Sequence, residues 1–289
     1  MDVVDAQVHL NKLVPEWRTA DATTVVLSAV EAMDSLGIAA VLIDEDTGHD
    51  RDGRLGPATL LANGSSRFVY PFSERAVELR PDRFAYLAKC DPLDPDLDDV
   101  IADIAARPRQ LCLRVIPEPE TGDLARFEAG GHDAVFRAVG RHDLPVFVWL
   151  PGRVRLLERY ARDFPSVRFV IDHCGVALPR TGQPRLAGPQ GLDDVLWMAR
   201  YENVALKWCK APRFSVEAYP FPDLMPHLCR VLDAFGRERV MWASDCTEVA
   251  GDHSWGEALG YVRDSPGLSA DDKSWLLGRT ARVLLRWPR

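Results

Sequence analysis

Two histidines and one aspartate follow apolar runs that lie far apart in the 289-residue chain. His9 follows such a run near the start, His173 near the middle and Asp245 near the end. A carboxylate flanked by two imidazoles can take a proton from water and polarise a carbonyl oxygen, which is the chemistry of ester or lactone hydrolysis. We therefore expect Asp245 to be the base that activates water, and His9 and His173 to donate to the carbonyl oxygen.

Each of these residues also has a purely structural interpretation. Asp245 follows Ser244 after a strand, where an aspartate often caps a helix. His173 follows Asp172, and such a histidine is often an interior group with satisfied hydrogen bonds. The agreement of three separate strand ends favours the functional interpretation, because strand ends from distant parts of a chain meet only if the sheet closes into a barrel.

The elements that would position these residues alternate along the chain. Continuous apolar runs indicate parallel strands that are buried on both faces, and each is followed by a helix or by a loop and a helix. This order predicts an α/β protein with one (β/α)8 TIM barrel domain over residues 1–289. An open doubly wound sheet stays an alternative, although no Gly-x-Gly-x-x-Gly turn follows the first strand. The predicted strands are 3–8, 38–43, 84–88, 110–116, 145–149, 167–171, 204–207 and 239–243, and the predicted helices are 23–36, 97–106, 133–141, 154–164, 192–200, 224–235 and 271–285.

Two polar stretches interrupt this order. Residues 44–66 predict a long surface loop or a partly helical excursion, and residues 179–191 predict a second loop. Loops at the strand ends set substrate specificity in this architecture, so the sequence does not name the substrate.

Composition limits the classes of partner. The formal net charge is −8 and no basic stripe is present, which argues against nucleic acid and anionic membranes and favours a small-molecule substrate. No apolar run reaches the length of a membrane span, and the first residues are acidic where a secretory signal is basic, so we expect a cytoplasmic protein. The six cysteines form no Cys-x-x-Cys pair and are expected to be reduced. A homodimer is one option for the assembly, since dimers are common.

Several further residues are expected to contact the substrate. Arg114 and Lys207 lie near strand ends, where each could meet a substrate carboxylate or instead form an ordinary ion pair. Aromatic rings at a barrel mouth suit a flat or ring-bearing substrate, but large aromatic residues are more often simply packed. The expected substrate-binding residues are Gln7, Arg114, Lys207, Trp149, Trp208 and Glu248.

Five motifs, in this order, resemble the amidohydrolase-related (amidohydrolase 2) family of the amidohydrolase superfamily: Val4–His9, Ile171–Gly175, Val204–Lys207, Trp242–Asp245 and the closing stretch Leu268–Ala281. The resemblance covers nearly the whole chain. It implies a (β/α)8 barrel with its chemistry at the carboxyl ends of the strands. It also implies substrates that include lactones, amides and carboxylic acids undergoing decarboxylation.

The resemblance also bears on metal binding. Members with a metal carry His-x-His on strand one, a ligand near the end of strand five, a histidine on strand six and an aspartate on strand eight. This chain keeps His9, His173 and Asp245, but it has Gln7 in place of the first histidine, and strand five contains none. A side-chain amide is a poor zinc ligand, so we expect no tightly bound metal, as in the similar pyrone-dicarboxylate lactonases.

The leading hypothesis is therefore a metal-independent hydrolase of a small lactone or ester-type carboxylated ring compound. A second hypothesis is a metal-dependent decarboxylase or hydrolase in which His9, His173 and Asp245 hold a loosely bound zinc or manganese. A third is a barrel that has lost catalysis and binds a ligand or a partner protein.

Overall fold

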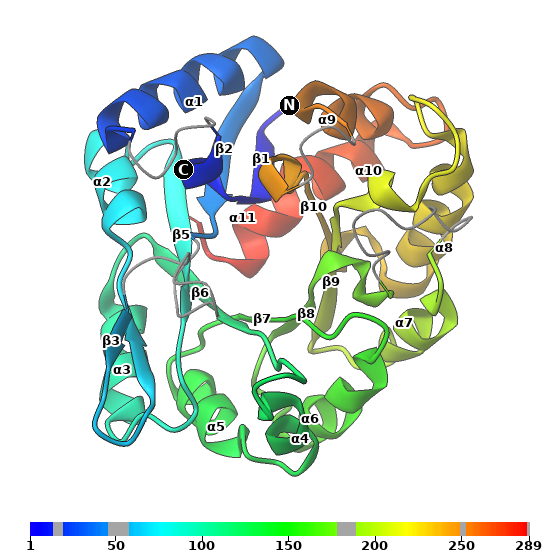
Figure 1. Cartoon of the computed structure of the whole chain (residues 1–289). Helices are drawn as coiled ribbons and strands as arrows, with labels where there is room; N and C mark the ends of the chain where they lie inside the picture. Colours follow the sequence, from blue (N-terminus) through cyan, green and yellow to red (C-terminus); the bar gives the residue numbers. More distant parts are fainter. Residues whose placement is uncertain (14–19, 46–57, 178–188, 249–252, 288–289) are drawn as a thin grey trace.

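Eight parallel strands form the centre of the protein in the computed structural model, which describes residues 1–13, 20–45, 58–177, 189–248 and 253–287. Their spatial order follows the chain, and every observed pairing in this sheet is parallel. Figure 1 shows the strands as a ring with most of the helices around it, whereas α11 (Thr280–Leu284) is seen through the ring. The strands are β1 (Val3–Val8), β2 (Ile38–Ile43), β5 (Phe84–Lys89), β6 (Gln110–Val115), β7 (Val146–Val148), β8 (Phe169–Ile171), β9 (Val204–Cys209) and β10 (Val240–Ala243).

The ring closes between its first and last strands. The amide of Asp245 donates to the carbonyl oxygen of Gln7 at 3.1 Å, and the amide of Ser244 donates to the Asp5 carboxylate at 2.9 Å. These bonds join the segment after β10 to β1. The predicted (β/α)8 barrel and all eight predicted strands are confirmed, whereas a single domain over residues 1–289 stays a prediction.

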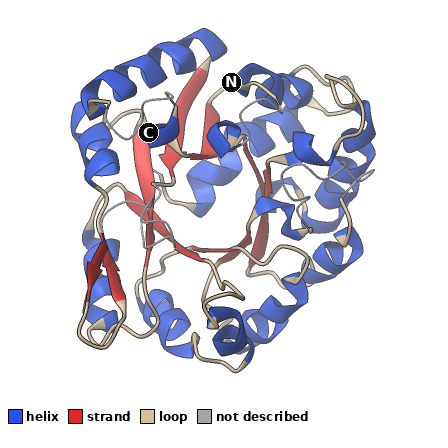
Figure 2. Cartoon of the chain, in the orientation of Figure 1, coloured by secondary structure: helices blue, strands red, loops and turns tan. Residues whose placement is uncertain are grey.

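Helices cover the outside of the ring (Figure 2). The predicted helices are present, 97–106 and 133–141 with the predicted bounds and the others with shifted ends, whereas α2, α4 and α9 were not predicted. A short antiparallel hairpin, β3 (Ala58–Leu60) with β4 (Ser66–Phe68), lies where a loop was predicted, and residues 46–57 of that stretch lie outside the described residues. In the described ranges, no helix combines the length and apolar character needed to cross a membrane. The helices named so far or used below are α1 (Ala22–Leu36), α2 (Pro71–Leu79), α3 (Leu97–Ala106), α4 (Asp123–Glu128), α5 (Asp133–Arg141), α6 (Glu158–Asp163), α7 (Leu192–Met198), α8 (Met225–Phe235) and α9 (Trp255–Arg263).

The apolar side chains form two layers because neighbouring residues on a strand point to opposite faces. The outer layer lies between the strands and the helices and contains most of the large residues. The inner layer fills the barrel with smaller side chains, including Ala6, Ala40, Ala85 and Ala205. The tight inner packing leaves the polar side chains at the carboxyl ends of the strands as the part of the barrel that can face a ligand.

The last predicted helix is not continuous. Residues 271–285 form α10 (Ala270–Ser274), one π-helical segment (Trp275–Arg279) and α11 (Thr280–Leu284). Gly278 lies in the π-helical segment, where an added Cβ would be 1.8 Å from the carbonyl oxygen of Asp2. Glycine therefore lets this helical segment pack directly on the start of β1.

Asp5 links three elements from inside the protein. Its carboxylate accepts hydrogen bonds from the Trp255 indole of α9 at 2.7 Å, from the backbone N–H of Ser244 at 2.9 Å and from the backbone N–H of Gln7 at 3.2 Å. Burial raises the pKa of Asp5 from 3.8 to about 6, although these hydrogen bonds oppose the shift. Asp5 is thus an internal acid whose ionisation opposes folding.

We expect the stability of the protein to depend on pH through Asp5. The raised pKa in the folded state favours the protonated form, so the stabilising contribution is complete below pH 4 and is lost as the pH rises to about 6. Relative to Asp5→Asn, the wild-type free energy of unfolding should fall by about 3 kcal/mol over this window. Urea unfolding of both proteins from pH 4 to pH 7 measures the difference, and parallel pH profiles would contradict the assignment.

Candidate active site

His9, His173 and Asp245 meet at the carboxyl ends of β1, β8 and β10. The Asp245 carboxylate lies 3.0 Å from His173 Nε2 through Oδ2, and 3.3 Å from His9 Nε2 through Oδ1. All three side chains are almost fully buried. The expectation that distant strand ends bring these groups together is met by the geometry of the barrel.

A second carboxylate orients His173 from the other side. His173 Nδ1 lies 2.8 Å from Asp172 Oδ1, so each ring nitrogen faces a carboxylate oxygen. Asp172 also accepts from Arg114 Nε at 2.7 Å, and Arg114 forms a further ion pair with Asp44 at the end of β2. His173 is therefore fixed in orientation by a network that spans β2, β6 and β8.

Three lysines complete the cluster. Lys210 Nζ lies 3.1 Å from Asp245 Oδ2, and Lys89 Nζ lies 3.5 Å from Asp44 Oδ1. Lys207 Nζ lies 2.6 Å from Asp172 Oδ1 and donates to the side-chain oxygen of Gln7. In the described part of the chain, the site thus combines four cationic side chains, Lys89, Arg114, Lys207 and Lys210, with three carboxylates, Asp44, Asp172 and Asp245.

The negative charges of the cluster lie deeper in the protein than most of the positive charges. The carboxylates of Asp44, Asp172 and Asp245 have no exposed surface, whereas the side chains of Lys89 and Lys210 are each 13% exposed. Arg114 is 7% exposed. A ligand that approaches from solvent therefore meets basic groups first, which favours an anionic ligand.

These cations determine the ionisation of the two central carboxylates. Burial alone would raise the pKa of Asp245, but Lys210, His173 and His9 together hold it well below its usual value. Burial alone would also raise the pKa of Asp172. The positive charges of Arg114, His173 and Lys207 outweigh this effect and hold the pKa of Asp172 well below its usual value. Asp245 is therefore ionised before a substrate binds, so it can accept a proton but cannot donate one in the first step.

The backbone at the site is held in an uncommon conformation. His173, Cys174, Lys210 and Asp245 have positive φ angles of 50°, 59°, 59° and 51°. Non-glycine residues adopt this region rarely, at a cost of about 1–3 kcal/mol each, and such residues cluster at active sites. Here the positive angles occur where the chain leaves β8, β9 and β10, at residues within or next to the cluster.

The structure separates the expected substrate-binding residues into two groups. Gln7, Arg114 and Lys207 belong to the cluster, and Gln7 also donates to Asp44 at 3.3 Å. Trp208 does not: its indole is fully buried in the outer layer and donates to the hydroxyl of Tyr261 on α9 at 2.7 Å. The physical reason is strand alternation, since Lys207 points into the barrel and its neighbour must point out.

The other two expected residues lie at the rim. Trp149 directly follows β7 and is partly exposed. Glu248 ends the short 3-10 helix Cys246–Glu248 after Asp245, and its side chain lies outside what the structure describes. Of the second predicted specificity loop, residues 178–188 also lie outside the described residues.

Four members of the cluster were not predicted as site residues: Asp44, Lys89, Asp172 and Lys210. The sequence did carry a signal for three of them, because Asp44 follows the apolar run of β2, Asp172 follows that of β8, and Lys89 ends β5. Lys210 lies beyond the end of β9 and has a positive φ angle, which the sequence does not reveal.

The donor atoms of this cluster fit a divalent metal poorly. Asp172, His173 and Cys209 offer ligand atoms that lie within 4.8 Å of one another. However, Asp172 is already bound by Arg114 and Lys207, and burial raises the pKa of Cys209 well above its usual value, which favours the thiol over the thiolate that a metal needs. Four neighbouring cationic side chains would also repel a dication.

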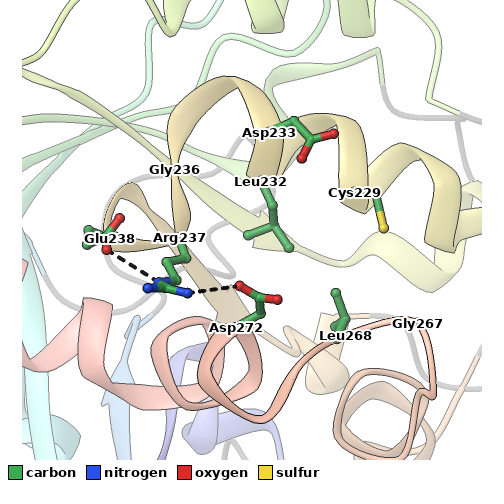
Figure 3. A pocket seen from close by; sticks show the side chains of 9 residues that line it. All are labelled: Cys229, Leu232, Asp233, Gly236, Arg237, Glu238, Gly267, Leu268 and Asp272. Atoms are coloured by element: carbon green, nitrogen blue, oxygen red, sulfur yellow. Dashed lines mark hydrogen bonds and ion pairs between the residues drawn. The ribbon is translucent and has the colours of Figure 1, made fainter.

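A separate surface hollow lies at the opposite end of the barrel. It has a volume of about 450 Å³ and lies between the end of α8, the segment before β10 and the segment before α10. Figure 3 shows Arg237 at its edge, bonded to Glu238 and to Asp272. None of its lining residues belongs to the cluster, so this hollow contributes nothing to the chemistry described above.

Comparison with known proteins places this chain in a family. The chain is 31% identical over 154 residues to the L-fucono-1,5-lactonase of Burkholderia ambifaria, and it spans about half the length of that curated relative, with 51% of this chain and 50% of the relative covered. A zinc-bound amidohydrolase from Burkholderia multivorans superposes over 100% of both chains with a TM-score of 0.70 and 18% identity. A putative 2-pyrone-4,6-dicarboxylic acid hydrolase from Pseudomonas putida superposes over 100% of this chain and 98% of its own, with a TM-score of 0.64 and 16% identity.

The solved structures are too distant in sequence to show more than the common fold. The family assignment rests instead on a family model described as amidohydrolase, which matches residues 74–287. That range includes Asp172, His173, Lys207 and Asp245. The resemblance stated from the motifs is thereby confirmed, and the chain belongs to the amidohydrolase family, a family of enzymes.

Proposed function

We propose that the protein hydrolyses a small lactone or a related ester of a carboxylated ring compound. The observation that carries this proposal is the contact of one ionised, buried carboxylate, Asp245, with both His9 and His173. The similarity to a lactonase supports the reaction class. The positions of Lys89 and Lys210 on the solvent side of the cluster support an anionic substrate.

In the proposed reaction, Asp245 accepts a proton from water while the water oxygen bonds to the lactone carbonyl carbon. The carbonyl oxygen gains negative charge, which nearby cationic groups such as Lys210 stabilise, while His173, whose two ring nitrogens both face carboxylates, holds Asp245 in place. The ring C–O bond then breaks, and the leaving oxygen takes the proton back from Asp245. The products are a hydroxyl group and a carboxylic acid, and Asp245 is again ionised.

The proposed reaction needs no metal, in keeping with the cationic character of the cluster. A metal-dependent hydrolase or decarboxylase is the second candidate, because one protein of the same fold binds zinc and because Asp172, His173 and Cys209 lie close together. Assaying a panel of lactones and aromatic carboxylic acids before and after chelation separates the two. Lactone hydrolysis that survives chelation supports the proposal, and activity that is lost on chelation and restored by zinc or manganese contradicts it. Binding without any turnover would favour the non-catalytic barrel.

We expect Lys89→Met to weaken substrate binding selectively. Lys89 lies on the solvent side of the cluster, and a hydrogen bond to a charged partner contributes about 1.5–3 kcal/mol. KM for a carboxylated lactone should therefore rise about tenfold or more, with a smaller change in kcat and little change for the matching methyl ester. Steady-state kinetics on both substrates measures this, with Lys273→Met on α10 as the control; equal losses on both substrates would argue against a carboxylate contact.

A further inference from the structure

Lys207 is a lysine inside the barrel. Its side chain has no exposed surface, and its ammonium lies 4.5 Å from the centre of the Phe147 ring. A buried charge is costly unless it is paired and hydrogen-bonded. Here the partners are Asp172 Oδ1 at 2.6 Å and the side-chain oxygen of Gln7. The side chain thus points to the centre of the cluster and away from the solvent from which a substrate arrives.

The position of Lys207 matters for the groups that perform the chemistry. Asp172 holds His173 Nδ1, and His173 Nε2 in turn faces Asp245. Lys207 fixes the same Asp172 oxygen that holds His173, and it ties that oxygen to Gln7 on β1. One ammonium therefore joins β1, β8 and β9 beneath the proposed base.

We propose that the Lys207 ammonium, paired with Gln7, is a built-in cation that organises this centre in place of a divalent metal. The inference rests on the proposed metal-free hydrolysis and names the residue that makes it possible. Lys207 acts through Asp172 and His173, so it is a positioning residue and does not bind the substrate.

The chemistry of Gln7 fits this pairing. Its amide offers an acceptor to Lys207 and, through Nε2, a donor to Asp44. A histidine at this position offers one donor and one acceptor only in its neutral form, and it would otherwise oppose the ammonium with a positive charge. The contributions of Gln7 and Lys207 to stability should therefore be coupled, so that each residue stabilises the protein less when the other is replaced.

Metal content tests the proposal independently of activity. We compare the wild type with Gln7→His, Lys207→Met and the double variant after incubation with ZnCl2 and desalting, and we measure zinc by mass spectrometry and the thermal midpoint with and without zinc. The wild type and Gln7→His should retain zinc below one equivalent, because the ammonium remains. The double variant should retain one zinc per chain and gain stability with it. One zinc per chain in the wild type, or equal zinc in Gln7→His and the double variant, would overturn the proposal.

Two further measurements test the pairing of Gln7 with Lys207 if the zinc-binding variants fold poorly. Unfolding of Gln7→Met, Lys207→Met and their double variant should show that the double variant loses less stability than the two single losses combined. Additive losses would contradict the pairing. If a lactone substrate is found, Lys207→Met should lower kcat with little change in KM, whereas a raised KM alone would mean substrate contact. A failure to find any substrate would defeat the proposed function but leave the zinc and stability results decisive for Lys207.

Discussion

Replacing Asp245 by asparagine is expected to lower kcat/KM for lactone hydrolysis by about 10²- to 10⁴-fold, the usual contribution of a general base. The asparagine has nearly the same shape, so it keeps contacts with His173 and His9 while it loses the charge that accepts the proton. The folded state should persist, because Lys210 is 13% exposed and can reach water when its partner is neutral. Initial-rate assays with circular dichroism measure both effects.

A matched control distinguishes loss of the base from a general effect of removing a carboxylate. Asp193 on α7 pairs with Arg230, and its side chain is 90% exposed. Asp193→Asn should leave kcat/KM unchanged. An Asp245→Asn enzyme within a few-fold of wild-type activity would mean that another group activates water.

Replacing Arg114 by methionine is expected to cost about 3–5 kcal/mol of stability, because breaking a buried ion pair leaves charge without compensation. Arg114 bridges two carboxylates that have no exposed surface, Asp44 and Asp172, and it is itself almost fully buried. Its loss also frees the carboxylate that orients His173, so activity should fall together with stability. Urea unfolding measures the free energy of unfolding. Activity assays at urea concentrations well below the unfolding transition report on the site in the folded variant.

The control for this change is an exposed arginine. Arg230 is 51% exposed and pairs with Asp193, and Arg230→Met should change stability by less than about 0.5 kcal/mol. If Arg114→Met unfolds at the wild-type urea concentration, then Lys89, Lys207 and the histidines suffice to compensate both carboxylates. The network would then be redundant.

The barrel could be predicted from the sequence because each strand is a continuous apolar run, and the three central residues could be predicted because each follows such a run. The shorter elements were harder. α9 begins with a capping box, in which Ser254 and Glu257 bond each other's backbone amides, and this spacing was readable in the sequence. α2 has only the weaker start signal of Pro71 at its first position, and no side chain caps the start of α4.

The direction of each side chain was the larger obstacle. Lys207 and Trp208 are neighbours on β9, so only one of them can point into the barrel, but their sequence does not say which. Both had been expected to bind the substrate. The backbone turns after β8, β9 and β10 depend on positive φ angles at non-glycine residues, and tertiary contacts determine these.

The seam between β1 and β10 determines when activity can arise during synthesis. β1 is synthesised before β10, so the bond from the Asp245 amide to the Gln7 carbonyl oxygen can form only after β10 has emerged from the ribosome. Translation intermediates that lack β10 hold His9 and His173 without Asp245. Under the proposed mechanism, turnover requires that β10 docks on β1, and recovered turnover during refolding would report the moment at which the ring becomes continuous.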